Sequence, residues 1–204
     1  MLVDFDILLP QNIGRHRLGM NHLFHSKSVA LAEELARSAP SATLRASPAG
    51  AMSVDLSAVD FVIDATGEEA LGHLLAQKLS GAAFRPSLSV WIEGPGTAVR
   101  ALLRDSPGAA CVRCLKTFDR TPIYRVVDGE LPSMFAGNGC ESLYVPFPAT
   151  ASMQAACLGA EMAVDWINGD VSPRLRTRVL DTGLRPGSED VDAKRQASCP
   201  ACST

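Results

Sequence analysis

The sequence predicts an α/β fold in which a mostly parallel sheet carries helices on both faces. The first observation is an alternation of strand-like and helix-like segments along residues 2–80, the order that parallel sheets produce. The second is segment 60–67, DFVIDATG, which is short and apolar, as parallel strands covered on both faces are. The third is a Gly-Pro-Gly turn between strand-like segments 87–94 and 97–104, which predicts a hairpin.

The N-terminal elements begin with a strand and continue into a helix. Residues 2–7 are expected to form a buried strand whose tip carries two aspartates. Residues 26–38 have helical periodicity, with Ser26 in the N-cap position. The face expected to be buried consists of Val29, Ala32, Leu35 and Ala36. A weak strand is expected at 42–47.

Two more helices and a strand are expected farther along. Residues 68–80 form a helix with two glutamates at its positive end. Residues 150–168 form the longest helix, which is apolar on most sides and is therefore expected to be buried. Gly169 is its expected C-terminal stop. The last strand is expected at 174–182.

Composition limits the classes of protein to consider. The 204 residues suit one domain, and 47% hydrophobic against 20% charged residues allow a real core. A net charge of −3 gives no basic surface for nucleic acid. The chain has no run of about 18 apolar residues that would span a membrane, and its start lacks the pattern of a signal peptide. We expect a cytoplasmic protein that acts without a membrane or nucleic acid.

Two Cys-x-x-Cys pairs are the most specific local signal. They are Cys111 with Cys114 and Cys199 with Cys202. Each turn presents two thiolates to one ion, and two turns complete a tetrahedral site of four sulfurs that is typical of structural zinc. One pair alone would also fit a redox motif. We expect one zinc ion in a closed site that clips the C-terminal tail onto the hairpin.

The two cysteines outside these pairs and three histidines near the N-terminus could also suggest functional sites. Cys157 lies in the longest helix and is expected to be a small core residue. Cys140 follows two glycines in the irregular segment FAGNGCES, and two interpretations stay open: an inert loop cysteine or a nucleophilic thiol that accepts an acyl group. The histidines lack a nearby carboxylate or thiol and are expected to be surface or packing residues. They are His16, His22 and His25.

Several stretches carry the motifs of one family in the same order. The first is VDFDILLPQNIGRHRLGMNHLFHSK, which contains a strand with an acid, an Asn-x-x-Arg box and a lysine. The second is the strand and turn of VIDATG. The others are the cysteine pairs in GAACVRCL and SCPAC and the helix in YVPFPATASMQAACLGAEMAVDWINGD. Together they resemble the ThiF/MoeB/HesA family, the fold of ubiquitin-activating enzymes. The resemblance implies one Rossmann-like adenylation domain over 1–204. Its parts would be a nucleotide-binding part (1–104), the first zinc pair with a crossover loop (105–148), and the long helix, strand and second zinc pair (149–204).

The resemblance implies that ATP adenylates the C-terminal glycine of a ubiquitin-like or sulfur-carrier protein. Asp4 would bind the ribose, Asn12 and Arg15 the phosphates, and Lys27 would neutralise phosphate charge. Arg15 would thereby act in catalysis, because charge develops on the α-phosphate and on the leaving pyrophosphate. Cys140 would form a thioester with the activated carrier.

Simpler roles stay open for the same residues. Asn12 would also serve as a turn cap, and Arg15 would also pair with a surface acid. Lys27, near a helix start, would ordinarily be a solvated charge.

Two features depart from the family pattern. The glycine-rich loop and first strand that cradle phosphate are missing, so we expect the chain to start at the second strand of a truncated domain. After DAT, Gly67 and Glu68 replace an Asp-Asn that helps to hold magnesium. Glu68 or Asp64 is expected to serve instead, since Mg²⁺ needs only one or two carboxylates. These departures suggest a divergent branch, such as a bacterial conjugation system in antiphage defence.

Three functions compete at this point. The first is an ATP-dependent adenylyltransferase that pairs as a homodimer, activates a ubiquitin-like or sulfur-carrier protein, and hands it to a conjugating enzyme. The second is a non-catalytic scaffold or partner subunit of such an enzyme, inactive because the phosphate loop is missing. The third is a nicotinamide-dependent oxidoreductase, which also places an acid after a strand; the cysteine pairs and the Asn-x-x-Arg box argue against it.

Overall fold

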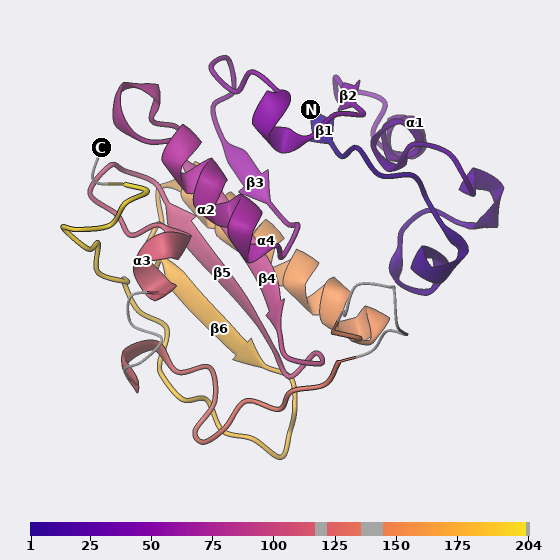
Figure 1. Ribbon diagram of the computed structural model, residues 1–204. Coiled ribbons are helices and arrows are strands. Elements are labelled where there is room, and N and C mark those ends of the chain that lie inside the picture. The colour runs from indigo at the N-terminus through magenta and orange to yellow at the C-terminus, as the bar shows by residue number, and fades with distance from the viewer. Residues whose placement is uncertain (117–121, 136–144, 203–204) are drawn as a thin grey trace. The chain divides into compact units, whose positions relative to one another are not determined.

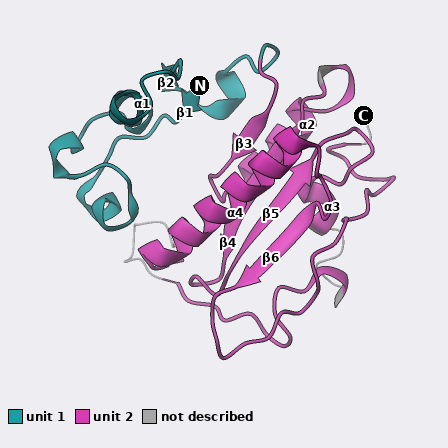
Figure 2. Ribbon diagram, turned by 180° about the vertical axis from the view of Figure 1, so that it is seen from behind, with its two compact units in different colours: residues 1–58 teal, residues 59–204 magenta. Residues whose placement is uncertain are grey.

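The computed structural model describes residues 1–116, 122–135 and 145–202. The chain forms two compact units, Met1–Ala58 and Val59–Thr204 (Figure 2). Each unit is described by itself below. Among the residues that the structure describes, no helix is both long and apolar enough to cross a membrane.

The smaller unit is a short β–α–β arrangement. β1 (Leu2–Val3) pairs in parallel with β2 (Ala46–Ser47), and α1 (Lys27–Ser38) connects them in sequence and contacts both. Its core is small and consists of Leu8, Leu18 and Ala30, with Ile13 and Leu31 packed against it. The parallel pairing agrees with the predicted order, but both strands are much shorter than expected.

α1 begins after Ser26 as predicted, but its buried face is only partly the expected one. Val29 and Ala36 are exposed, whereas Ser28 and Ala30 are buried. The reason is a hydrogen bond from the Ser28 hydroxyl to the Asp4 carbonyl, 2.9 Å long, which turns this polar residue toward the strand. A side-chain contact therefore overrides the hydrophobic pattern.

The larger unit contains a four-stranded mixed sheet in the order β3-β4-β5-β6. β3 (Val62–Asp64) is parallel to β4 (Ser87–Glu93), which forms the predicted hairpin with β5 (Ala98–Arg104). β6 (Leu175–Val179) is antiparallel to β5. The α/β fold with parallel strands and a hairpin is confirmed.

Helices lie on both faces of this sheet (Figure 1). α4 (Ala149–Asn168) covers one face, and α2 (Glu69–Lys78) with the short α3 (Val112–Lys116) lies on the other. The α4 side forms a core of strand and helix side chains: Leu88, Val90, Val99, Ala101, Leu103, Ala155, Leu158 and Met162. Shorter 3-10 helices span Pro10–Arg15, Met20–His22, Ala51–Ser53, Gly81–Ala83 and Pro122–Tyr124.

α4 ends at Gly169 as predicted, where the backbone has φ of 82° and a side chain would be strained. The helix is not buried on most sides, however. Its buried residues lie on the sheet-facing side only: Ala151, Ala155, Leu158, Gly159 and Met162. Cys157 points to the other side and is exposed, so its assignment to the core was wrong.

β3 also differs from the prediction. Ile63 is 54% exposed, so the strand is not covered on both faces as its apolar sequence indicated. Among the described residues β3 pairs with β4 alone, which places it at an edge of the sheet. Apolar composition alone does not separate an edge strand from an inner one.

We expect Gly159→Leu to destabilise the larger unit. A Cβ atom at Gly159 would lie 3.0 Å from Val90 Cγ2, so a larger side chain would separate α4 from β4. Overpacking of this kind costs about 1–3 kcal/mol, which would lower Tm by several degrees in a thermal melt. Gln154→Leu, on an exposed side of the same helix, is the control. Equal melting temperatures for the two variants would contradict this packing.

Candidate functional site

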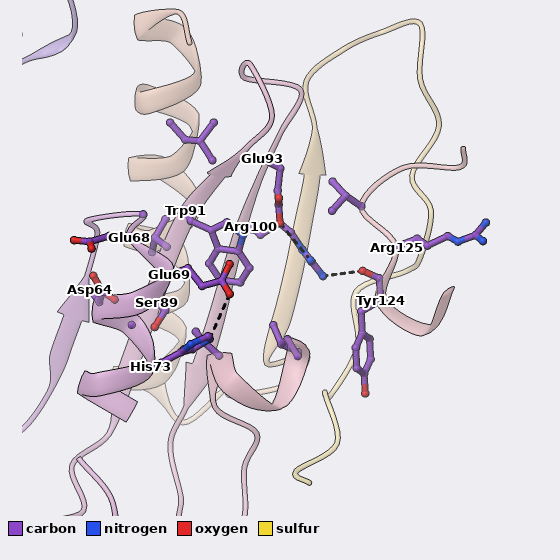
Figure 3. A pocket seen from close by; sticks show the side chains of 17 residues that line it. Asp64, Glu68, Glu69, His73, Ser89, Trp91, Glu93, Arg100, Tyr124 and Arg125 are labelled. Atoms are coloured by element: carbon purple, nitrogen blue, oxygen red, sulfur yellow. Dashed lines mark hydrogen bonds and ion pairs between the residues drawn. The ribbon is translucent and has the colours of Figure 1, made fainter. Parts of the chain in front are cut away.

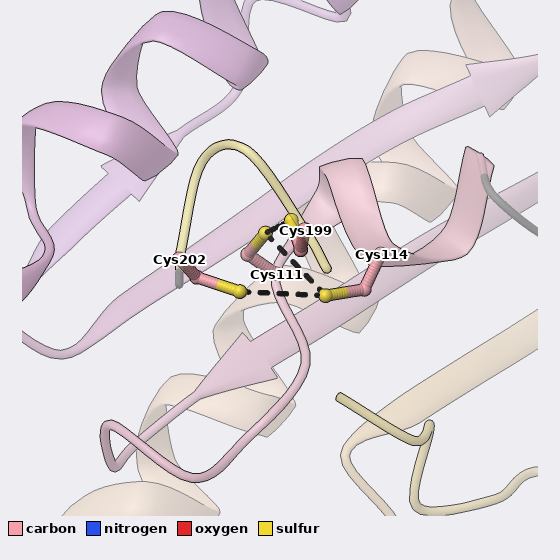
Figure 4. Close-up of side chains that lie close together, drawn as sticks. All are labelled: Cys111, Cys114, Cys199 and Cys202. Carbon is pink, nitrogen blue, oxygen red and sulfur yellow. Dashed lines mark hydrogen bonds between the residues drawn. The ribbon is translucent and has the colours of Figure 1, made fainter. Parts of the chain in front are cut away.

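Four cysteine thiols from distant parts of the chain meet in the larger unit (Figure 4). Their sulfur atoms lie within 4.8 Å of one another. Cys111 Sγ is 3.7 Å from Cys199 Sγ, and Cys114 Sγ is 3.5 Å from Cys202 Sγ. A tetrahedral zinc site with Zn–S bonds of about 2.3 Å has S–S edges of about 3.8 Å. The residues therefore fit a four-sulfur metal site, and the convergence expected from the sequence is confirmed.

The four thiols are buried, so several thiolates at this place would need a bound cation to balance their charge. The hydrogen bond between Cys111 and Cys114 raises the pKa of Cys111 and lowers that of Cys114. Burial raises the pKa of Cys202. The Gln196 N–H donates to Cys114 Sγ at 3.4 Å, a contact that stabilises a sulfur ligand.

The four-cysteine centre is anchored to the end of α2. The Ser80 hydroxyl contacts the carbonyls of Ala76 and Ala201, at 2.5 Å and 2.9 Å. The Arg104 guanidinium donates to Ser80 Oγ at 3.0 Å and to the Ala76 carbonyl at 3.2 Å. Arg104 is only 3% exposed and lies over the ring of Phe84. A positive charge at this helix C-terminus is favourable.

A pocket of about 390 Å³ opens on the same face of the sheet (Figure 3). Its walls come from the turn after β3, from α2, from α3 and from residues 124–126. Its floor is formed by β4 and β5, where Ser89, Trp91, Glu93 and Arg100 contribute side chains. Strand alternation sends these residues away from α4, toward a sheet face that α2 and α3 leave partly open.

A polar network holds the floor of the pocket. Trp91 Nε1 donates to Glu93 Oε1 at 2.7 Å, and Arg100 Nη1 lies 3.5 Å from the same oxygen. Arg100 also donates to the Tyr124 carbonyl at 3.2 Å, and its guanidinium carbon lies 5.6 Å from the centre of the Trp91 ring. Arg100 is only 6% exposed. One buried arginine thus connects the sheet to the loop that forms the far wall.

Carboxylates gather at the rim where β3 ends. Asp64 Oδ1 accepts hydrogen bonds from the Thr66 N–H at 3.1 Å and from the Thr66 hydroxyl at 2.8 Å. This turn places Glu68 and Glu69 at the start of α2, beside Asp64 on the pocket wall. The two candidates for magnesium binding, Glu68 and Asp64, therefore lie on the same rim. Carboxylate oxygens are the ligands that Mg²⁺ takes from proteins.

The residues expected at ATP lie in the smaller unit, except for Glu68. Lys27 Nζ forms an ion pair of 2.8 Å with Asp6 Oδ2, and its side chain is only 15% exposed, so it is not a solvated charge. Asp4 Oδ1 accepts the Asp6 N–H at 2.8 Å. Burial and then the charge of Lys27 lower the pKa of His16. Asp4, Asp6, His16 and Lys27 thus share one electrostatic environment.

Asn12 and Arg15 belong to one 3-10 helix in this unit. Asn12 Oδ1 accepts the Leu9 N–H at 3.0 Å, so the turn-capping role left open by the sequence is present. Arg15 ends the same helix. Their proposed contacts with phosphate stay predictions. Cys140 lies outside the described residues, so its role as nucleophile also stays a prediction.

Sequence reasoning did not identify the pocket floor. Trp91, Glu93 and Arg100 lie in segments 87–94 and 97–104, for which the sequence predicted only a hairpin. A signal was present in the alternation of polar and apolar residues in SLSVWIE and in the arginine in the middle of AVRALLR. Polar residues at every second position of a strand indicate a face that is not simply core.

Comparison with protein-family models finds no match. The chain is 52% identical over 203 residues to "ATP-dependent ubiquitin transferase-like protein Cap2" of Pseudomonas aeruginosa (strain BWHPSA011 / Pa011), covering 100% of this chain and 37% of that protein. It is 26% identical over 215 residues to a protein of the same name from Escherichia coli (strain TW11681), covering 98% of this chain and 35% of that one. The chain thus spans little more than a third of these relatives.

Solved structures with the same fold include E. coli MccB. The complex with MccA-N7isoASN has a TM-score of 0.71 at 14% identity and covers 100% of this chain and 59% of MccB. The complex with ATP has a TM-score of 0.67 at 13% identity and covers 98% and 57%. Together with the Cap2 homologues, these matches confirm the resemblance that the sequence motifs indicate.

We expect about one zinc ion per chain in the purified protein. Cys114→Ser and Cys199→Ser should each lose the metal and lower Tm, because a three-sulfur site binds zinc more weakly and the tail is no longer clipped to the sheet. Elemental analysis and thermal melts measure both effects. Cys157→Ser is the control, since that cysteine is exposed on α4 and does not belong to the cluster of four. A folded wild-type protein without zinc would contradict the assignment.

Proposed function

We propose that this chain, a homologue of Cap2 in the ThiF/MoeB/HesA type of fold, is part of an ATP-dependent adenylyltransferase for the C-terminus of a ubiquitin-like or sulfur-carrier protein. The observation that carries the proposal is the pocket on the sheet, with carboxylates at its rim and a rigid polar floor, in a chain 52% identical to a Cap2. In the reaction the carrier's terminal carboxylate attacks the α-phosphate of ATP. An acyl adenylate forms and pyrophosphate leaves.

The shape of the pocket suits an extended peptide. Asp64 is paired in register with Ser89, and the floor continues along β4 through Trp91 to Glu93. The four steps from residue 89 to residue 93 span about 13 Å, which an extended tail of about five residues would also span. A peptide lying along β4 would bring its C-terminus to the rim near Asp64.

The charge of the rim suits a metal ion between enzyme and substrate. Asp64, Glu68 and Glu69 would repel a carboxylate and a phosphate that approach without a cation. Mg²⁺ bound by Asp64 or Glu68 would remove this repulsion and stabilise charge on the phosphate oxygens. This chain's own contribution is the turn at Thr66, which fixes the positions of these carboxylates.

ATP would be bound by residues of the smaller unit. Asp4 suits a ribose hydroxyl because it is an acid at the end of a strand. Arg15 offers a planar donor pair for phosphate, and Asn12 lies on the same 3-10 helix. The Asp6 ion pair fixes Lys27 in one orientation before any nucleotide binds. Such preorganisation lowers the entropy lost when phosphate binds.

A second step would transfer the acyl group to Cys140. Its thiolate would attack the acyl adenylate, release AMP and leave a thioester that a conjugating enzyme accepts. Cys140→Ala should abolish a thiol-labile adduct with the carrier, and Cys157→Ala should retain it. An adduct that persists in Cys140→Ala would exclude this cysteine as the nucleophile without affecting adenylation.

A non-catalytic partner subunit is the second candidate function. It is favoured by Gly67 and Glu68, which stand where the family usually has the Asp-Asn that helps to bind magnesium. A chain that binds the carrier tail without binding ATP, measured by calorimetry, would support this function over the first.

We expect a glycine-ended peptide to change the fluorescence of Trp91. The chain has two tryptophans, Trp91 at the pocket and Trp166 stacked on Phe61 at 4.2 Å on the α4 side. Titration with the carrier's tail peptide should shift the emission of wild type and of Trp166→Phe. Trp91→Phe should lose the shift. A shift that survives in Trp91→Phe would place the peptide elsewhere.

We expect Arg15→Lys to weaken ATP-dependent activation by 10-fold or more, because a lysine cannot make the planar bidentate contact (about 1.4 kcal/mol per tenfold). ATP–pyrophosphate exchange in the presence of the carrier measures this. Arg17→Lys is the matched control. Arg17 is exposed, and its ion pair with Glu34 is a long one of 4.0 Å, so we assign it no phosphate contact. Equal loss in both variants would argue against a phosphate contact by Arg15.

A further inference from the structure

Arg104 is a buried charge on β5 whose described contacts are all with neutral groups. The residue is only 3% exposed. It contacts the Ala76 carbonyl, the Ser80 hydroxyl and the Phe84 ring. Its Nε atom is buried and has no hydrogen-bond partner in the part of the chain that the structure describes. A buried cation is costly without a negative charge nearby, so the source of that charge has to be found.

The other arginines of β5 and β6 each have an acidic partner. These pairs are Arg100 with Glu93, Arg176 with Asp165, and Arg178 with Glu161. Among the described residues Arg104 has no such partner, although it is more deeply buried than Arg100. The sheet therefore contains one positive charge that no contacting carboxylate balances.

The four-cysteine centre lies next to Arg104. Cys111 and Arg104 line the same small cavity, which has a volume of about 20 Å³. The cavity has room for one water molecule, which would give Nε the acceptor that it lacks. The Ser80 hydroxyl accepts a hydrogen bond from Arg104 and contacts the Ala201 carbonyl, next to Cys202 in the chain. Arg104 is thus connected to the centre in two ways, across the cavity and through Ser80.

Zinc bound by the four cysteines would supply the negative charge that Arg104 lacks. Four thiolates and one Zn²⁺ carry two net negative units, and all four cysteines are buried. A second arginine reaches the centre from the surface, because the exposed Arg195 donates a hydrogen bond to the Cys202 carbonyl. Two arginines thus match two negative units.

We propose that Arg104 is the buried counter-charge of the metal-bound cysteine centre and that Arg195 supplies the second positive charge. A centre made neutral in this way costs less to bury and holds its metal more tightly. Arg104 acts on the metal without touching it, as groups around metal ligands do elsewhere. The inference rests on the zinc assignment and not on the proposed function, so its test uses neither ATP nor a carrier.

Asp64 is the competing partner for Arg104, because it lines the same cavity. Its described hydrogen bonds come from the turn at Thr66 instead. If Asp64 were the counter-charge, removal of the charge of Arg104 would leave the affinity for zinc unchanged. The affinity for zinc therefore distinguishes the two partners.

Arg104→Met removes the charge and keeps most of the side-chain volume. We expect it to weaken zinc binding by about 10–100-fold, the usual effect of changing a group that surrounds metal ligands. Arg104→Lys retains a positive charge and should recover most of the lost affinity. Arg195→Gln should weaken binding less than Arg104→Met does, because water screens an exposed charge. Competition with a chelator on the zinc-loaded protein measures each affinity.

Two controls separate the charge of Arg104 from its role in packing. Ser80→Ala removes the contact with the Ala201 carbonyl but leaves the charge, so it should lower Tm without a comparable loss of zinc affinity. Arg113→Met removes an exposed arginine of the first cysteine turn, which contacts His73 Nδ1 at 3.0 Å. Its zinc affinity should equal that of wild type.

The reduction potential of an iron-substituted centre gives a readout that packing alone would not change. Reduction of Fe³⁺ to Fe²⁺ adds one negative unit to the centre, and a nearby positive charge favours it. Arg104→Met should therefore lower the potential, by about 59 mV for each tenfold change in the redox equilibrium. Ser80→Ala should leave the potential unchanged.

The proposal would be overturned by an Arg104→Met variant that matches wild type in zinc affinity and potential. An equal loss of zinc affinity in Ser80→Ala would also overturn it, since packing would then explain the effect. If Arg104→Met does not fold, Arg195→Gln at the surface decides, and an unchanged potential in that variant would contradict the proposal. A folded wild type without zinc would overturn it together with the zinc assignment and leave the proposed function standing.

Discussion

The larger unit is closed by the meeting of two cysteine pairs, 111/114 and 199/202, which lie 88 residues apart in the chain. Beyond β6 the tail has no helix or strand of its own within the described residues. Closing so long a loop costs conformational entropy, which the burial of Ala193, Cys199, Ala201 and Cys202 in the core of the unit partly offsets. A metal ion bound by the four sulfurs would add to this, because its binding free energy would also be folding free energy.

Once the tail is held there, it forms the outer support of the pocket. Val127 bridges to Pro186, and the Lys194 N–H donates to the Tyr124 hydroxyl at 2.9 Å. Tyr124 in turn accepts the hydrogen bond from Arg100. The wall of the pocket therefore rests on the tail on one side and on the sheet on the other. The four-cysteine centre thus lies at the end of a tail that supports one wall of the pocket.

Two buried arginines on β5 show how the same residue type serves two purposes. Arg100 has an acidic partner in Glu93 and lies at the floor of the pocket. Arg104 donates to the Ala76 carbonyl and to Ser80, and lies over the ring of Phe84. A buried charge is tolerated only when nearby groups replace its hydration. Glu93 and the Trp91 ring do this for Arg100. The Ala76 carbonyl, the Ser80 hydroxyl and the Phe84 ring do it for Arg104.

Local signals predicted the elements well. Ser26 precedes α1, Gly169 ends α4 with a positive φ, and the Gly-Pro-Gly turn joins β4 to β5. Each of these signals depends on the backbone preferences of one to three residues that are adjacent in the chain, so it can be recognised without knowing the tertiary contacts. Burial was predicted less well. Cys157, Ile63 and Val29 are all apolar and all exposed.

The sequence by itself determined the order of strands and helices, the two cysteine pairs and the motifs that identify the fold. Cysteine spacing is sufficient for the pairs because a Cys-x-x-Cys turn presents two thiolates locally. Only the tertiary structure decided which face of α4 meets the sheet, which strand lies at an edge, and that Trp91, Glu93 and Arg100 form a pocket floor. These outcomes depend on contacts between residues far apart in the chain. The pattern of hydrophobic residues along the sequence does not predict such contacts.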